Sequence, residues 1–205
     1  MSGPAQRLTL DHGAWLELFE PFLARDDTPA LFAALMHEVP FEARALRLFG
    51  REVMQPRLVA WVGDAEAVYQ YSGMQYVPTP FGPTLQALRG RVQAACQTRF
   101  NSVLCNLYRD GQDAMGMHSD REPELGPNPI IASLSLGESR RFVLRHRQGK
   151  SHTQADLLLT DGSLLVMRGT TQQVYRHGLP RARRVTGPRI NLTFRYTDAR
   201  LRRTG

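Results

Sequence analysis

The sequence predicts a mainly β protein with flanking helices, built as a sandwich of sheets or as a double-sheet jelly roll. Beyond residue 100, short strand-like segments follow one another to residue 197, and Gly, Pro, Asn and Asp turns separate them at the intervals that such folds use. Before residue 100, two segments have helical periodicity instead. With 205 residues, 42% of them apolar, the chain is long enough for one domain with an ordinary hydrophobic core.

Two helices are expected in the first hundred residues. Residues 1–25 hold a mostly apolar run, after which Thr28-Pro29 matches an N-cap followed by an N1 proline. This signal predicts a helix that continues to about Glu38. Residues 45–82 hold short β-like pieces interrupted by glycine and proline. A second helix is predicted over residues 84–98, because apolar residues recur there at helical spacing.

The strands predicted beyond residue 100 are short and closely spaced. They cover residues 102–108, 115–119, 130–136, 141–146, 156–160, 163–167, 173–177 and 189–196. The last strand alternates without a break: its apolar residues share one face, and its polar residues share the other. The polar residues are Arg189, Asn191, Thr193 and Arg195. A surface strand has the same alternation, so the pattern alone leaves open whether the polar face meets water or the interior of a barrel.

The charge of the chain is strongly basic, with a formal net charge of +7. Nearly all cations are arginine, and Lys150 is the single lysine. A basic surface favours a polyanionic partner, and arginine suits bidentate contacts with phosphate. The preference for arginine over lysine can also reflect genome base composition, so the charge alone does not establish nucleic-acid binding.

Several other classes of protein are not indicated. Cys96 and Cys105 form no C-x-x-C motif, which argues against a disulfide framework and against a structural zinc site. There is no signal-peptide pattern and no apolar run of transmembrane length, so we expect a soluble intracellular protein without a membrane partner. The nucleophile elbow G-x-S-x-G and the phosphate-binding P-loop are both missing.

His118-x-Asp120 and the later His177 are candidate metal ligands. Residues two apart share a face on a strand, so His118 and Asp120 can reach one ion from a strand. Two histidines and one carboxylate leave coordination positions open, as in non-haem iron(II) oxygenases. The pattern is short enough to arise by chance, and a lone histidine often only satisfies a local hydrogen bond.

The two arginines of the last strand offer independent support. Their Cα atoms are expected about 20 Å apart, so long side chains leaning toward each other can hold a short dianion from both ends. Guanidinium groups bind carboxylates well, and an iron-chelating 2-oxo acid has a far carboxylate to anchor. Asn106 and Tyr108 offer further donors from one strand face. Two arginines buried without an anion would be costly, so either the polar face of the last strand is solvated or a ligand supplies the negative charge.

These residues resemble the motifs of the AlkB family of iron(II)/2-oxoglutarate dioxygenases over about residues 46–196. The matching stretches are Asn106-x-Tyr108, Asp110-Gly111, His118-x-Asp120-x-Glu122, Ser133-x-Ser135-x-Gly137, Phe142, Gly162-Ser163-Leu164-Leu165, His177 and Arg189-x-Asn191-Leu192-Thr193-Phe194-Arg195. The chain is most similar to the homologues that repair alkylated duplex DNA. The resemblance implies a double-stranded β-helix (jelly roll) over 101–197, preceded by helices and a nucleotide-recognition lid within 1–100. A basic tail, 198–205, follows in the same single domain.

The resemblance also implies roles for individual residues. The Fe(II) ligands would be His118, Asp120 and His177. The 2-oxoglutarate ligands would be Asn106, Tyr108, Arg189, Asn191, Thr193 and Arg195, with Arg189 on the distal carboxylate and Arg195 near the iron. The substrate-binding residues would be Phe49, Gly50, Tyr69, Tyr71, Ser72, Arg121, Glu122, Arg183 and Arg184.

Some of the substrate roles have a structural alternative. Phe49 is either a finger that fills the vacated base stack or a core residue, and Tyr69 and Tyr71 are either pocket or packing residues. Arg183 and Arg184 are either phosphate contacts or an ordinary solvated loop.

The implied activity is oxidative demethylation of N1-methyladenine and N3-methylcytosine in DNA by a monomer that uses Fe(II), 2-oxoglutarate and O2. The reaction releases formaldehyde, succinate and carbon dioxide, and its expected place is the cytoplasm and nucleoid, or the nucleus of a eukaryote. Arg121 departs from the family pattern, because the most similar homologues have an acid there, and its charge either shifts the preference among lesions or points to phosphate. The alternatives are a related oxygenase acting on RNA, protein or a small molecule, and a non-catalytic basic β-domain that binds nucleic acid.

Overall fold

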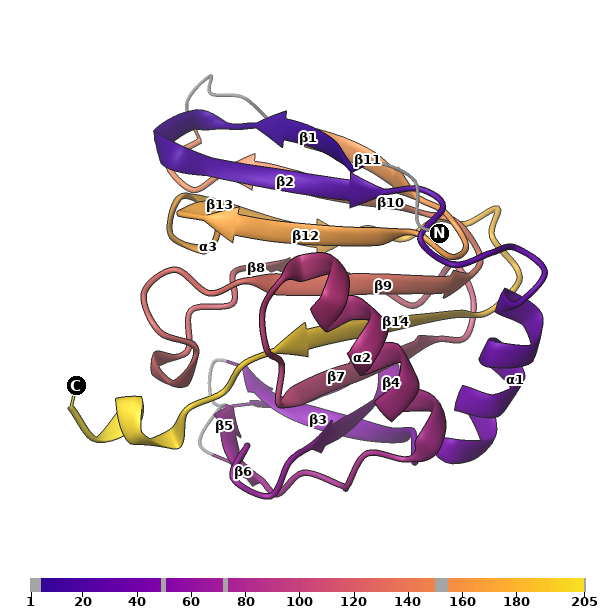
Figure 1. Ribbon diagram of the computed structural model, residues 1–205, viewed down its shortest axis with the longest axis horizontal. Helices are drawn as coiled ribbons and strands as arrows, with labels where there is room; N and C mark the ends of the chain where they lie inside the picture. The colour runs from indigo at the N-terminus through magenta and orange to yellow at the C-terminus, as the bar shows by residue number, and fades with distance from the viewer. Residues whose placement is uncertain (1–4, 49–50, 72–73, 150–154, 205) are drawn as a thin grey trace.

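Two antiparallel sheets form most of the molecule (Figure 1). The computed structural model describes residues 5–48, 51–71, 74–149 and 155–204. The strands are β1 Gln6–Thr9, β2 Ala14–Phe19, β3 Glu42–Leu48, β4 Arg51–Gly63, β5 Tyr69–Tyr71, β6 Met74–Tyr76, β7 Ser102–Tyr108, β8 Met115–His118, β9 Ile131–Gly137, β10 Arg140–His146, β11 Ala155–Leu159, β12 Leu164–Gly169, β13 Tyr175–Leu179 and β14 Arg189–Arg195. The helices are α1 Thr28–Glu38, α2 Pro83–Cys96 and α3 Thr171–Val174, with 3₁₀ turns η1 Asp11–Gly13, η2 Pro123–Leu125 and η3 Ala199–Thr204.

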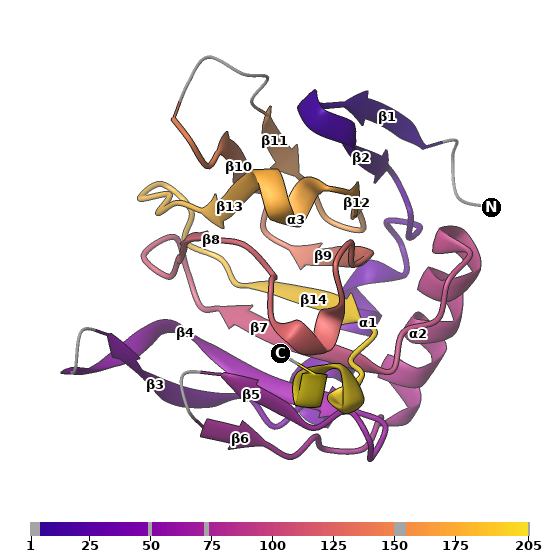
Figure 2. The same cartoon turned by 90° about the vertical axis from the view of Figure 1, so that its left-hand side faces the viewer.

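The larger sheet has the strand order β1-β2-β12-β9-β14-β7-β4-β3, and the smaller has the order β11-β10-β13-β8. Strands β5 and β6 form a separate hairpin beside β3 and β4 (Figure 2). The two larger sheets pack face to face through one apolar cluster, to which Ile131 and Met167 contribute from the large sheet and Phe142 and Leu144 from the small one. The predicted mainly β fold with flanking helices and a jelly roll is confirmed.

Strand β14 lies in the middle of the large sheet. It pairs with β9 on one side and with β7 on the other, and all seven of its residues are buried. Its apolar residues Ile190, Leu192 and Phe194 belong to the core cluster under the helices. Its polar residues therefore point between the two sheets, because successive side chains of a strand point to opposite faces.

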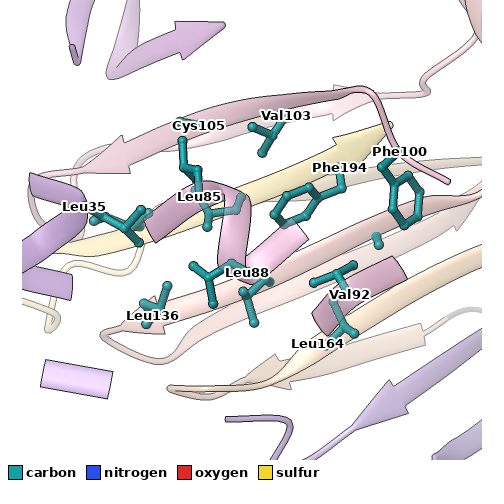
Figure 3. Close-up of a cluster of buried hydrophobic side chains, with 14 of the residues drawn as sticks. Leu35, Leu85, Leu88, Val92, Phe100, Val103, Cys105, Leu136, Leu164 and Phe194 are labelled. Atoms are coloured by element: carbon teal, nitrogen blue, oxygen red, sulfur yellow. The ribbon is translucent and has the colours of Figure 1, made fainter. Parts of the chain in front are cut away.

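Helices α1 and α2 cover the outer face of the large sheet. Leu85, Leu88 and Val92 of α2 point toward Phe194 and Val103 of the sheet (Figure 3). The two helices occur where the sequence predicts them.

The start of α2 is held by a side chain of α1. The carboxylate of Glu38 accepts hydrogen bonds from the backbone N–H groups of Thr84 and Leu85 at 2.9 and 3.1 Å. An acid at a helix N-terminus satisfies exposed donors and complements the helix dipole. This contact fixes the packing of the two helices on the sheet.

The large sheet takes strands from both sides of residue 100. Strand β2, in the apolar run at the start of the chain, pairs with β12, and β4 pairs with β7. Ala14 and Leu16 of β2 are buried while Trp15 and Glu17 are partly exposed, so this run alternates as a strand does. The strand predicted at 173–177 is instead the helical turn α3 followed by β13. None of the helices in the described part of the chain has the length and apolar character that crossing a bilayer requires.

Candidate active site

The small sheet brings the two candidate histidines together. His177 of β13 and His118 at the end of β8 are direct cross-strand neighbours, and their ring centroids are 4.3 Å apart. One ligand atom from each of His118, Asp120 and His177 lies within 4.8 Å of the other two. His177 and Asp120 are buried, whereas His118 is partly exposed. The described residues thus contain a facial group of two imidazoles and one carboxylate.

Asp120 reaches this group in a different way from the one expected. Strand β8 ends at His118, so His118 and Asp120 do not share a strand face. The reason is a set of side-chain hydrogen bonds that replaces the strand ladder: Ser119 Oγ donates to the carbonyl of Tyr175 at 2.7 Å, and the N–H of Asp120 donates to Gln172 Oε1 at 2.9 Å.

The charges of the group suit a metal ion. Burial lowers the pKa of His177 to about 3, with the positive charge of His118 as the next cause, so the imidazole of His177 is neutral and its lone pair is available. Burial raises the pKa of Asp120, but the charges of Arg195, His177 and His118 together outweigh burial and keep this pKa below its usual range. Arg195 Nη2 donates to Asp120 Oδ1 at 2.5 Å.

One buried atom of the group fits a cation. Asp120 Oδ2 is buried, has no hydrogen-bond partner among the described residues and lies 3.7 Å from Nε2 of His177. Unsatisfied buried polar atoms are rare in folded proteins, and nitrogen and oxygen donors of this kind fit Fe(II). The residues present therefore fit an iron ion held by His118, Asp120 and His177.

A cavity between the sheets adjoins this group and contains all the predicted co-substrate residues. Its lining includes the three candidate ligands together with Asn106, Tyr108, Arg189, Asn191, Thr193 and Arg195. Arg189 and Arg195 lie at the two ends of the polar face of β14. The cavity thus has a guanidinium at each end and amide and hydroxyl groups between them, which suits a short dicarboxylate.

The guanidinium of Arg189 is 1% exposed and only partly satisfied by the protein. Its Nη2 donates to Ser135 Oγ at 2.9 Å, while its Nε has no partner among the described residues. Burial lowers the pKa of Arg189 to about 10, so it remains a cation at neutral pH. Such a buried, incompletely paired cation is costly unless an anion binds it.

Asn106 and Tyr108 lie beside Arg189 on the neighbouring strand. Asn106 pairs with Asn191 in the register of β7 and β14, and its Oδ1 accepts a hydrogen bond from Arg57 Nε at 2.8 Å. The ring centroid of Tyr108 is 5.5 Å from Cζ of Arg189. The backbone register therefore sets the order of groups along the cavity.

Arg140 is a buried residue of this region that the sequence did not single out. Its guanidinium donates to the carbonyl groups of Asp110, Asp113 and Pro180 at 2.8–3.1 Å, and it lies 5.6 Å from the ring centroid of Tyr108. It thus joins two loops, the one after β7 and the one after β13, at the Arg189 end of the cavity. The predicted strand started at 141, one residue after Arg140, and an arginine beside a strand gives no signal of burial.

A second cavity of about 390 Å³ opens on the other side of the candidate iron ligands. It shares His118 and Asp120 with the first cavity, and its walls are largely apolar, with Trp61 and Met115 among them. Glu122 supplies a carboxylate to this cavity, and Arg57 supplies a cation. Of the predicted substrate residues whose side chains the structure describes, Glu122 lines this cavity.

The other predicted substrate residues fall into three groups. Phe49, Gly50 and Ser72 lie outside the described residues. Tyr69 and Tyr71 belong to β5. Arg121, Arg183 and Arg184 are exposed.

The loop that carries Arg183 and Arg184 is anchored by a close backbone contact. Gly111 N–H donates to the carbonyl of Val185, and Ala182 N–H donates to the carbonyl of Gly111. A Cβ atom at position 111 would overlap the carbonyl oxygen of Ala182, so the approach requires glycine.

Comparison with known proteins agrees with this geometry. The model of the 2OG-Fe(II) oxygenase superfamily matches residues 16–195. The human alpha-ketoglutarate-dependent dioxygenase alkB homolog 3 is 37% identical over 193 residues, which cover 89% of this chain and 67% of that protein. The chain belongs to the AlkB family. This AlkB-family protein is an Fe(II)/2-oxoglutarate-dependent dioxygenase, and its cofactors are Fe(II), 2-oxoglutarate and O2.

Two further comparisons define how far the likeness extends. The human protein named DNA oxidative demethylase ALKBH2 is 41% identical to this AlkB-family chain over 174 residues, covering 80% of this chain and 67% of ALKBH2. A solved structure titled "The structure of OsALKBH1" has a TM-score of 0.66 at 17% identity and covers 94% of this chain and all of that one. At that identity, the likeness to OsALKBH1 concerns the fold.

Proposed function

We propose that this dioxygenase demethylates alkylated bases of DNA, with N1-methyladenine and N3-methylcytosine as its first expected substrates. The observation that carries the proposal is the cavity of about 390 Å³ beside the candidate iron ligands, with apolar walls and the carboxylate of Glu122. A planar base fits an apolar cavity that has a few oriented polar groups. The names of the related demethylases support the same substrate class.

The carboxylate of Glu122 gives the cavity a preference for positively charged bases. Methylation at N1 of adenine or N3 of cytosine makes the base a cation, whereas the unmodified base is neutral. A carboxylate in a site partly withdrawn from water attracts the cation much more strongly than the neutral base. The electrostatics therefore favour the damaged base over the abundant undamaged one.

The residues of the chain hold and orient the reactants. Iron, 2-oxoglutarate and O2 together supply the oxidation: one oxygen atom goes into succinate as carbon dioxide leaves, and the other turns N–CH3 into N–CH2OH, whose N–C bond then breaks to give formaldehyde and the unmethylated base. In this proposal His118, Asp120 and His177 hold the metal, and Arg189 and Arg195 anchor the co-substrate through its two ends. The buried position of this centre between the sheets keeps water away from it.

The target base has to leave its stack before it can enter the cavity. Enzymes that act on a base in a duplex pay a few kcal/mol for unpairing and unstacking it. A methyl group on a Watson–Crick nitrogen already prevents normal pairing, so the damaged base leaves at a lower cost. The same lesion that is chemically suited to Glu122 is therefore also the easiest to extrude.

A substrate panel tests the proposed function. The Fe(II)-loaded enzyme would receive oligonucleotides with one N1-methyladenine or N3-methylcytosine, as DNA or RNA and as single strands or duplexes, and formaldehyde and repaired base would be measured. We expect turnover of the methylated DNA and none of the unmodified strands, and the Asp120→Asn variant serves as the inactive control. Succinate formation with a protein or small molecule, and no formaldehyde from any oligonucleotide, would contradict the proposal.

A further inference from the structure

Three arginines lie together beside the candidate iron ligands, on the solvent side of the small sheet. Arg176 directly precedes His177 on β13, Arg121 directly follows Asp120, and Arg147 directly follows the end of β10. Arg121 and Arg176 are exposed, and Arg147 is partly exposed. Because neighbouring residues of a strand point to opposite faces, Arg176 points outward where His177 points inward.

A pair of hydrogen bonds brings together the segments that carry these arginines. Arg147 Nη1 donates to Ser119 Oγ at 2.9 Å, and Ser119 Oγ donates to the carbonyl of Tyr175 at 2.7 Å. The two bonds tie together the end of β10, the end of β8 and the start of β13. Arg121 is two residues from Ser119, and Arg176 is the neighbour of Tyr175, so the backbones that carry the three arginines lie close to this pair of bonds.

The charges of this group are not balanced by the protein. Burial, followed by the positive charges of Arg121 and Arg176, lowers the pKa of Arg147. Among the residues that the structure describes, no carboxylate forms an ion pair with Arg121, Arg147 or Arg176. By contrast, two other arginines of the same sheet, Arg141 and Arg145, both form ion pairs with Asp156, at 2.5 and 2.7 Å. Like charges held together without a counter-ion repel each other, and an anion bound between them removes that cost.

We propose that Arg121, Arg147 and Arg176 form a binding site for a backbone phosphate of the strand that carries the target base. The inference rests on the proposed function, because it takes nucleic acid as the substrate. Arg121 stands in the chain between Asp120 and Glu122, which both line the second cavity, so the site lies beside the cavity that would take the base. When a base enters the cavity, the anion nearest to this site is a backbone phosphate next to that base in the same strand.

This position separates the three arginines from the other predicted phosphate contacts. Arg183 and Arg184 follow β13, whereas Arg176 lies at its start, so the two basic groups are at opposite ends of that strand. Phosphate contacts fix the register of a nucleic acid without reading its sequence. We therefore expect the three arginines to act on single strands and duplexes alike, and on every sequence equally.

The test is a salt titration of binding with the Fe(II)-loaded enzyme and 2-oxoglutarate under anaerobic conditions. Fluorescence anisotropy would follow a labelled single strand carrying N3-methylcytosine. Each phosphate contact to a single strand contributes about 0.7 to the slope of log K against log salt. The triple variant Arg121→Gln/Arg147→Gln/Arg176→Gln removes the contact with one phosphate, so it should lower the slope by about 0.7 and weaken binding about fivefold near 0.1 M salt.

Two further variants make the result specific. Arg25→Gln/Arg91→Gln/Arg99→Gln removes the same charge from the side of the large sheet that faces the helices, and it should keep the wild-type affinity within about twofold, because exposed charges beyond the Debye length are screened. Arg121→Gln/Arg176→Gln leaves the bond between Arg147 and Ser119 intact, so it tests the site even if the triple variant unfolds. A salt slope lower than that of the wild type, with an unchanged melting temperature, is the expected result.

The outcomes distinguish this inference from the proposed function. If the wild-type enzyme releases formaldehyde from methylated DNA but the double and triple variants keep its salt slope and its KM, the phosphate site is wrong and the function stands. If the matched control variant loses as much affinity as the triple variant, the effect belongs to net charge and the site is also wrong. If the wild-type enzyme binds and demethylates no nucleic acid, the proposed function itself fails.

Discussion

The iron centre and the basic surface beside it use neighbouring residues of the same strand in opposite ways. On β13, His177 is 5% exposed and points into the cavity between the sheets, whereas Arg176 is exposed and points to solvent. The buried centre needs each charge to have a partner, as Asp120 has in Arg195. The exposed arginines do not need a partner in the same way, because water stabilises their charges. Substitutions in the centre should therefore have large effects that salt hardly changes, while those on the surface should have small effects that salt removes.

The largest effect is expected for Asp120→Asn. The substitution keeps the size of the side chain but removes the charge that would hold the metal, so turnover should fall on the order of a thousandfold or more. It also leaves Arg195 buried without its carboxylate, which should cost about 3–5 kcal/mol of folding stability. Urea unfolding and the rise in melting temperature on adding Fe(II) would measure both effects. Glu122→Gln is the control, because it should keep the metal-dependent rise, and a variant of Asp120 that keeps it too would contradict the ligand assignment.

Arg189→Lys should have the next largest effect. Lysine keeps the positive charge but loses the planar fork that holds a carboxylate through two parallel hydrogen bonds. Charge-assisted hydrogen bonds contribute about 1.5–3 kcal/mol, so KM for 2-oxoglutarate should rise about ten- to a hundredfold. Succinate formation at varied 2-oxoglutarate would show it, and the affinity for an oligonucleotide should stay unchanged. An unaltered KM for 2-oxoglutarate would place the co-substrate anchor elsewhere.

The buried region was the easier one to predict from the sequence. The alternation of β14 is visible over seven residues, and burial of both of its faces turns the polar residues into the lining of a cavity. Strand periodicity also predicted the segments that carry His118 and His177, because it depends on local pattern alone. The position of Asp120 was predicted for the wrong reason. Hydrogen bonds between Ser119 and Tyr175 and between Asp120 and Gln172 replace the strand ladder there, and each joins residues that lie far apart in the sequence.

Contacts between segments far apart in the chain were not predictable in the same way. Arg140 is satisfied by carbonyl groups from two separate loops, and a single sequence contains no trace of such a pairing. The grouping of Arg121, Arg147 and Arg176 depends equally on the register of three strands. The basic composition indicated phosphate contacts in general, but only the fold selects which arginines lie together.

Glu122→Gln should reduce turnover of cationic lesions by about tenfold. Glutamine keeps the shape and a hydrogen-bonding oxygen but removes the charge, and the difference between a charge-assisted and a neutral hydrogen bond is about 1–1.5 kcal/mol. The expected loss appears in kcat/KM for N1-methyladenine and N3-methylcytosine, whereas KM for 2-oxoglutarate stays unchanged. A neutral methylated base, N3-methylthymine, serves as the matched substrate, because its turnover should not fall. Equal losses for charged and neutral bases would mean that Glu122 only shapes the cavity.

The smallest effect is expected for Arg183→Gln/Arg184→Gln. Both side chains are exposed on the loop that Gly111 anchors, and exposed ion pairs contribute about 0.6 kcal/mol each at the middle of their usual range, so KM for an oligonucleotide should rise about eightfold at low salt. Raising the ionic strength to about 1 M shortens the screening length to about 3 Å, and the difference from wild type should then disappear. The loss caused by Arg189→Lys should remain under the same conditions, because its partner is bound in a buried cavity. If the rise in KM for the double variant persists at high salt, these arginines support the fold of the loop. The difference in salt dependence between the buried centre and the charged surface would then not hold at this end of β13.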